Sequence, residues 1–160
     1  MSQQNPVRLF VTHAWQESDD YVRLFEFLES ARNFFYKNTG TPEHRPAGDT
    51  DAQREDLRRQ IGAAEILIAV PDLFVEHPDL LIFQMNFAKS VKKPVLLMQP
   101  FGSREPVNEL LKNRASEVVD WDERGLVDAI RRLARHEGTS RYETVEFNAE
   151  EFKDFKLDQP

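Results

Sequence analysis

The clearest pattern of apolar and polar positions lies between residues 66 and 100. Residues 66–70 and 95–98 are apolar throughout, and a Pro-Asp pair ends the first run. Between them, Leu80, Phe83 and Phe87 recur at helical spacing. Continuous apolar runs are typical of parallel strands that are covered on both faces. The stretch therefore predicts a strand, a helix and a second parallel strand.

Apolar runs and amphipathic segments alternate along the rest of the chain as well. Residues 7–12 predict a first strand, and Ser18 is expected to cap the helix that follows. Further strands are expected at residues 33–37 and 117–121, and further helices at residues 51–64, 106–112 and 123–136. Residues 38–50 hold two Gly and two Pro without apolar periodicity, which predicts a long loop. Asp79 is expected to cap the helix over residues 80–89.

This alternation of strands and helices predicts an α/β fold with three layers. We expect a doubly wound, flavodoxin-like sheet of five parallel strands in the order 2-1-3-4-5, within one domain at residues 1–136. Ligands of such sheets bind beyond the carboxyl ends of the strands. Here those ends are expected at residues 13–15, 38–50, 71–79 and 99–102. Residues 137–160 form a charged extension that we expect to pack on the core or on a partner.

Composition narrows the classes of function. The 160 residues are 40% hydrophobic and 31% charged, as in a globular domain, and the net charge of −7 argues against nucleic acid or an anionic membrane as partner. The chain has no cysteine, which excludes disulfides and fits a cytoplasmic location. The four histidines lack the spacing of a metal site, so no metal is expected. No apolar run approaches the roughly 18 residues of a membrane span, and the first residues lack the features of a signal peptide.

A few polar and aromatic residues stand out as candidates for chemistry. Gln84 lies inside the apolar surface of its predicted helix, where an amide must find hydrogen-bond partners. His13 could contact a nucleotide or simply bond to backbone, and Trp15 could stack on a ligand ring or pack at the edge of the core. The long loop carries polar residues that either gate a pocket or are solvated: Thr41, His44, Arg45 and Asp49. We expect one cleft to be lined by His13, Trp15, this loop and Gln84.

Several of these segments carry a family resemblance. Residues 9–15, Leu-Phe-Val-Thr-His-Ala-Trp, resemble the first strand and turn of TIR-like domains. Trp15 with the Ser18 and Asp20 that follow narrows this to bacterial TIR-like domains, which include the TIR subunits of Thoeris antiphage systems. Residues 41–44, 86–89 and 118–130 are similar to the loop after the second strand, the third helix, and the closing strand and helix of that family. The resemblance covers residues 7–134.

The resemblance implies a function. TIR enzymes cleave the nicotinamide–ribose bond of NAD, their substrate rather than a cofactor, and an effector protein senses the ADP-ribose-derived product. The catalytic glutamate of the family falls at Gln84, which has nearly its shape but no charge. The residues implied to bind the nucleotide are His13, Ala14, Trp15, Thr41, His44 and Asp49. A homo-oligomer or a phage protein as activator is also implied.

Several alternatives remain open at this point. Gln84 is either a replacement that traps an enzyme, the natural residue of a non-catalytic nucleotide-sensing or protein-interaction module, or a satisfied core amide. Glu76 is the nearest carboxylate that could substitute for the missing one. A phosphoacceptor receiver domain is set aside because Thr12 and His13 stand where its acidic pair belongs. A nucleoside deoxyribosyltransferase shares the layout but also needs a nucleophilic carboxylate.

Overall fold

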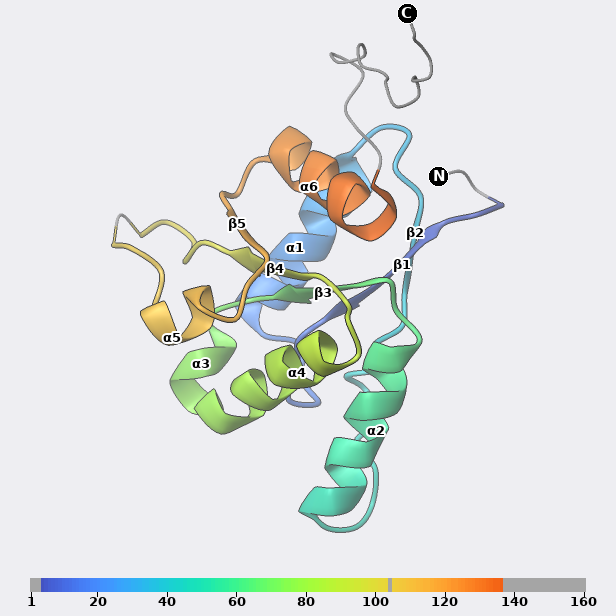
Figure 1. Ribbon diagram of the computed structural model, residues 1–160, viewed down its shortest axis with the longest axis vertical. Helices are drawn as coiled ribbons and strands as arrows, with labels where there is room; N and C mark the ends of the chain where they lie inside the picture. The colour runs from blue at the N-terminus through green and yellow to red at the C-terminus, as the bar shows by residue number, and fades with distance from the viewer. Residues whose placement is uncertain (1–3, 104, 137–160) are drawn as a thin grey trace, which may run out of the picture.

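The computed structural model describes residues 4–103 and 105–136, which form one parallel sheet between two layers of helices (Figure 1). The strands are β1 Val7–Val11, β2 Tyr36–Asn38, β3 Ile66–Ala69, β4 Val95–Met98 and β5 Glu117–Val119. The helices are α1 Asp19–Ser30, α2 Thr50–Gly62, α3 Leu73–Glu76, α4 Pro78–Ser90, α5 Glu109–Lys112 and α6 Glu123–Arg135. The sheet order is β2-β1-β3-β4-β5 with every pairing parallel, so the predicted fold class and strand order are confirmed.

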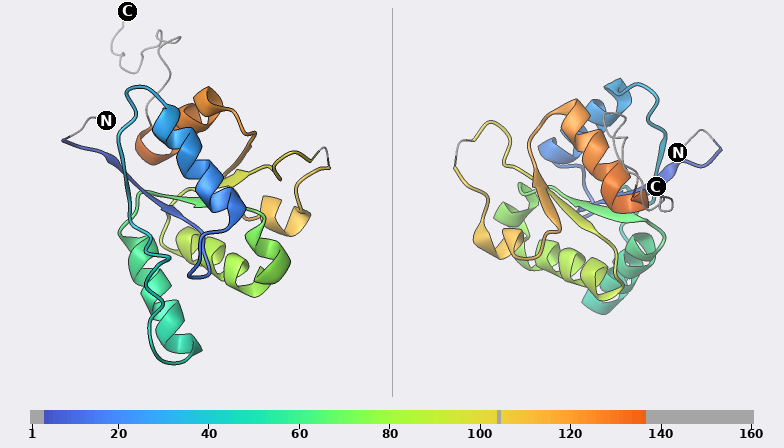
Figure 2. Two further views of the ribbon diagram at one scale, coloured as in Figure 1. Left: turned by 180° about the vertical axis from the view of Figure 1, so that it is seen from behind. Right: turned by 45° about the horizontal axis from the view of Figure 1, so that its top comes forward.

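The two faces of the sheet carry separate hydrophobic cores. On one face, α1 and α6 pack against alternate strand residues such as Leu9 and Ile68. On the other, α2 and α4 pack against the residues between them, such as Phe10 and Leu67. Successive side chains of a strand point to opposite faces, so a strand covered on both faces must be apolar at every position. The two views of Figure 2 show the blue and orange helices on one side and the green helices on the other.

Some element boundaries differ from the sequence-based prediction. The second strand begins at Tyr36 rather than at residue 33, because Asn33 adopts a left-handed backbone conformation with φ of 58° that ends the preceding turn. Asp79 does not cap α4, so that prediction is wrong. His77 is the N-cap residue and Pro78 occupies the first turn, which leaves Asp79 one position inside the helix. The short helix α3 lies in a stretch expected to be a loop.

The predicted cap of α1 is confirmed. The Ser18 hydroxyl accepts a hydrogen bond from Tyr21 N, as expected of the cap of α1. None of the helices that the structure describes is long and apolar enough to cross a membrane. The prediction that residues 137–160 pack on the core or a partner lies outside the described residues.

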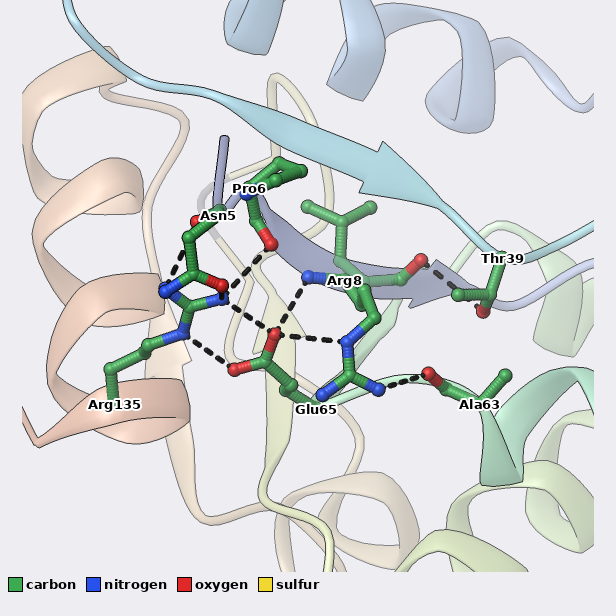
Figure 3. Close-up of polar contacts among 8 residues, drawn as sticks. Asn5, Pro6, Arg8, Thr39, Ala63, Glu65 and Arg135 are labelled. Carbon is green, nitrogen blue, oxygen red and sulfur yellow. Dashed lines mark hydrogen bonds and ion pairs between the residues drawn. The ribbon is translucent and has the colours of Figure 1, made fainter. Parts of the chain in front are cut away.

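An ionic network joins the amino ends of the central strands (Figure 3). Glu65, just before β3, accepts hydrogen bonds from Arg135 of α6 at 2.6 and 2.8 Å and from the backbone N–H of Arg8 on β1 at 3.0 Å. Arg135 also donates to the carbonyls of Asn5 and Pro6, and Arg8 donates to the carbonyl of Ala63 at the end of α2. The end of α6 is thereby tied to β1 and β3.

Candidate functional site

At the opposite, carboxyl end of the strands, α4 brings Gln84 against the turn after β1. The Gln84 side chain has no solvent-exposed surface. Its Oε1 accepts a hydrogen bond from His13 N at 3.2 Å, and its Nε2 donates to His13 O at 2.9 Å and to Leu80 O at 3.1 Å. Both amide hydrogens and the amide oxygen are therefore used, and Gln84 is a fully satisfied core amide.

The partners of Gln84 are specific for an amide. One backbone N–H and two carbonyl oxygens surround the side chain, so the oxygen must face His13 N and the nitrogen must face the carbonyls of His13 and Leu80. A glutamate in the same position could still accept from His13 N. An ionised carboxylate has no hydrogen to donate, however, and would lie against two carbonyl oxygens away from water. This arrangement favours glutamine over the glutamate of TIR enzymes.

The ring of His13 is held as well as its backbone. Trp15 N donates to Nδ1 at 3.0 Å, so Nδ1 carries no proton, and Nε2 lies 2.9 Å from Gln60 Oε1. These contacts fix a neutral imidazole with its proton on Nε2. Burial lowers the pKa of His13 below its ordinary 6.5, and the hydrogen bond to Gln60 and the charges of Asp56 and Glu43 oppose this only in part. His13 is therefore a neutral, structural group at physiological pH.

Gln60 on α2 completes the network. Its Oε1 also accepts from Thr41 N at 3.0 Å, and its Nε2 donates to Asp56 at 2.6 Å. The side chain is 2% exposed. Gln60 was not among the predicted site residues, although it lies three residues after Leu57 on the apolar edge of its helix, as Gln84 lies four residues after Leu80 on its own. Gln60, His13 and Gln84 form an amide network that joins α2, the turn after β1, the long loop and α4.

Trp15 lies next to this network with its indole half-buried. Its ring meets the His13 ring edge-on at 5.8 Å, and the Arg45 guanidinium lies 5.8 Å from the centre of the indole. The backbone has φ of 57°, a left-handed conformation that is uncommon for a bulky residue. The indole N–H is buried and has no hydrogen-bond partner in the structure. The His13 ring that accepts from Trp15 N is thus what holds this strained turn.

The other predicted nucleotide-binding residues have separate surroundings. Ala14 packs at the edge of the core beneath α4. The His44 side chain is 77% exposed and lies 3.8 Å from Glu43. Asp49 caps α2 by accepting a hydrogen bond from Ala52 N. In the long loop, Thr41 N donates to Gln60 Oε1 and the Thr39 hydroxyl donates to Gln60 O at 2.8 Å, so both residues join the network through Gln60.

The two central residues of the expected cleft, His13 and Gln84, are buried rather than lining an open space. Gln84 and His13 are 0% and 1% exposed, so neither presents a surface to a ligand in this structure. Glu76, the carboxylate considered as a substitute, is exposed and lines a separate cavity of about 280 Å³ with His77 and Asp79. Among the residues that the structure describes, no group of His, Asp and Glu side chains could hold a metal ion.

A cavity of about 630 Å³ opens between α1 and the segments after β3 and β4. Asp20, Asp72 and Arg23 line it. Asp72 accepts hydrogen bonds from the Ser18 hydroxyl and from Asp20 N, and Arg23 pairs with Asp20 at 2.5 Å while stacking 3.8 Å over the Phe101 ring. Burial and the nearby Asp72 raise the pKa of Asp20. These carboxylates make the cavity acidic.

Two comparisons with known proteins found no match. No family model matches the chain, and no curated protein matches it significantly. The fold and the contacts around Gln84 are therefore the observations from which a function can be argued.

Proposed function

We propose that this chain is a non-catalytic TIR-like module that acts by binding other proteins. The observation that carries the proposal is the side chain of Gln84, which is fully buried and donates both of its amide hydrogens to backbone carbonyls. Glutamine suits this position because an ionised glutamate has no hydrogen to donate to these two carbonyls. By the resemblance to TIR-like domains, this satisfied amide occupies the position of the catalytic carboxylate of TIR enzymes.

The chemistry of NAD cleavage supports the same conclusion. Breaking the nicotinamide–ribose bond builds positive charge on the ribose, and a carboxylate stabilises that charge as it does in glycosidases. Gln84 has no charge, and its side chain has no surface that a ribose could touch. Losing one such electrostatic contact typically costs about 3–4 kcal/mol in the barrier, or roughly a hundred- to a thousand-fold in rate.

In the two cavities that flank α1, charge favours a protein partner over a nucleotide. Among the described residues, the cavity at the carboxyl end of β3 and β4 carries Asp19, Asp20, Asp72 and Glu105 against one arginine, Arg23. A second cavity, between α1 and β2, carries four glutamates. Phosphate groups need clustered Lys or Arg, or free backbone N–H groups, and like charges repel them. Neither cavity suits an NAD-like ligand.

One observation favours a second candidate, an NAD-processing enzyme of the Thoeris type trapped by the loss of its glutamate. Gln84 lies directly against His13, and Trp15 and Thr41 are joined to the same network, so four residues that the resemblance assigns to one site are neighbours. This candidate requires the network to open and admit the nucleotide. It also requires Glu to be tolerated at position 84.

The test is NAD consumption by the wild-type chain and by Gln84→Glu, followed as release of nicotinamide. We expect neither protein to consume NAD. We also expect Gln84→Glu to be less stable by about 3 kcal/mol at pH 7.5, because its carboxylate is buried against two carbonyl oxygens. Gln16→Glu adds the same charge at an exposed position and serves as the matched control.

Two results would contradict the proposal. NAD cleavage that appears on introducing Glu at position 84, and not in Gln16→Glu, would establish the trapped enzyme. Rapid cleavage by the wild-type chain would show that another carboxylate is catalytic, and Glu76→Gln would then identify or exclude the nearest candidate. A Gln84→Glu protein as stable as the wild type would contradict the structural argument even without activity.

A further inference from the structure

A groove of about 780 Å³ runs between α1 and β2, at the edge of the sheet away from Gln84. Aromatic side chains form a row along it: Tyr21 lies 5.0 Å from Phe25, and Phe25 lies 5.8 Å from Tyr36, measured between ring centres. Val22, which is 41% exposed, extends the apolar surface. We call this feature the α1–β2 groove; Figure 2 shows its two elements from behind, α1 in blue and the β2 segment in cyan.

The walls of the α1–β2 groove are acidic. Glu17, Glu26, Glu29 and Glu43 line it, and the described part of its lining holds no Lys or Arg. Glu29 accepts a hydrogen bond from the Tyr36 hydroxyl, and Glu43 lies 3.8 Å from the exposed ring of His44. Within residues 4–103 and 105–136, neither Glu17 nor Glu26 has a hydrogen-bond or ion-pair partner for its side chain. Two carboxylates thus face the groove without a cation.

The negative charge acts on the aromatic row itself. Burial, together with the charges of Glu17 and Glu43 and against the hydrogen bond from Asn38, raises the pKa of Tyr21 to about 12. The carboxylates are therefore close enough to the rings for their field to be felt there. Carboxylates around aromatic faces are the surroundings that Lys and Arg side chains prefer, since the methylenes pack on the rings while the charged ends reach the acids.

The geometry of the groove suits an extended chain. β2 pairs only with β1 among the described strands, so its other edge carries backbone groups that no described strand satisfies. A segment lying along the groove would follow this edge and could add hydrogen bonds from its own backbone. A small organic cation would fill only part of a space of this size.

We propose that the α1–β2 groove binds an extended segment of another protein that carries alternating Lys or Arg side chains. The inference rests on the proposed interaction role and names the class of partner. Basic side chains on one face of the segment pair with Glu17 and Glu26, and their stems lie over Tyr21, Phe25 and Tyr36.

The test uses the full-length chain and a short labelled peptide that alternates arginine with valine, with binding followed by fluorescence anisotropy. The groove variant is Glu17→Gln combined with Glu26→Gln. The control variant is Glu109→Gln combined with Asp120→Asn, which removes the same charge from exposed positions near β5, at the opposite edge of the sheet. We expect the groove variant to weaken binding by about tenfold or more and the control variant by about twofold or less. Backbone NMR shifts are expected to cluster on α1 and β2.

Three outcomes would overturn the inference. Equal weakening in both variants would show attraction to the net charge alone. Binding of spermine at the same residues as tightly as the peptide would show a small-cation site. Shifts that cluster around Asp20 and Phe101 would move the site to the other acidic cavity. None of these outcomes depends on NAD consumption. The peptide-binding measurements therefore test the groove, and the NAD measurements separately test whether the chain is non-catalytic.

Discussion

The two ends of the sheet are held together by different chemistry. At the carboxyl end, neutral groups meet in a water-free setting: the amides of Gln84 and Gln60 and an uncharged His13. At the amino end, Glu65 and Arg135 form an ion pair whose side chains are 14% and 15% exposed. Burying an ion is expensive, whereas a buried amide costs little once its hydrogen bonds are made. The more deeply buried network around His13 therefore uses amides, and the more exposed network around Glu65 uses charges.

The largest expected effect comes from removing the amide at the buried end. Gln84→Met keeps the size of the side chain and leaves the backbone N–H and C=O of His13 without partners, at a cost of about 3 kcal/mol in the free energy of unfolding. Urea denaturation at pH 7.5 measures it. Because no ion pair is lost, the loss should be the same at about 0.1 M and 1 M salt. Gln16→Met, at an exposed position, should change little, and a loss below about 1 kcal/mol for Gln84→Met would contradict the network.

The ionic end should respond to pH and salt instead. Hydrogen bonds from Arg135 lower the pKa of Glu65 from 4.5 to about 2 in the folded state. The resulting stability is present above pH 4.5 and is lost as the pH falls toward 2. Glu65→Gln should therefore cost about 2 kcal/mol at pH 7 and much less at pH 3, after allowance for solvent screening. Glu109→Gln is the exposed control, and a pH-independent difference would contradict the ion pair.

A smaller effect should come from His13. Its pKa is lowered by burial, so the unfolded chain takes up the proton first, and the stability due to the neutral ring is present above pH 6.5 and is lost as the pH falls below it. Asn at position 13 does not titrate and can still accept from Trp15 N. His13→Asn should cost about 1 kcal/mol at pH 8, from the lost bond to Gln60, and less at pH 5.5.

Denaturation at the two pH values measures this difference. His44→Asn, on the exposed loop, should show no pH-dependent difference from the wild type. If His13→Asn and the wild type lose stability in parallel on acidification, another group is responsible for the acid sensitivity.

Most of the fold could be predicted because its signals are local. β3 and β4 are buried on both faces, so every residue of these strands must be apolar, and this shows in the sequence as consecutive apolar residues. The errors in the predicted element boundaries arose where the backbone preference of a single residue overrode the hydrophobic pattern. Asn33 turns the chain in a left-handed conformation and delays β2, and Pro78 takes the first helical position and moves the cap of α4 to His77.

The site could be predicted only in part, because its contacts are not local. The position of Gln84 in an apolar helix face showed that it needed partners, but its partner His13 lies 71 residues away in the sequence. Gln60 also lies on the apolar edge of its helix. The rest of that helix is polar, however, so a further glutamine in it does not stand out in the sequence. Nothing in the sequence around Glu65 marks it as the partner of Arg135, 70 residues further on.

The hydrogen bond from His13 N to Gln84 also allows local opening of the structure to be followed by amide hydrogen exchange. Thr12 N donates to Ile68 O within the sheet at 3.0 Å, whereas the next amide, His13 N, donates to a side chain of α4. Protons of these adjacent amides can exchange with solvent only when those bonds open. The exchange rate of Thr12 then reports separation of β1 from β3, and that of His13 reports undocking of α4. Two neighbouring amides thus distinguish the release of one helix from the opening of the sheet.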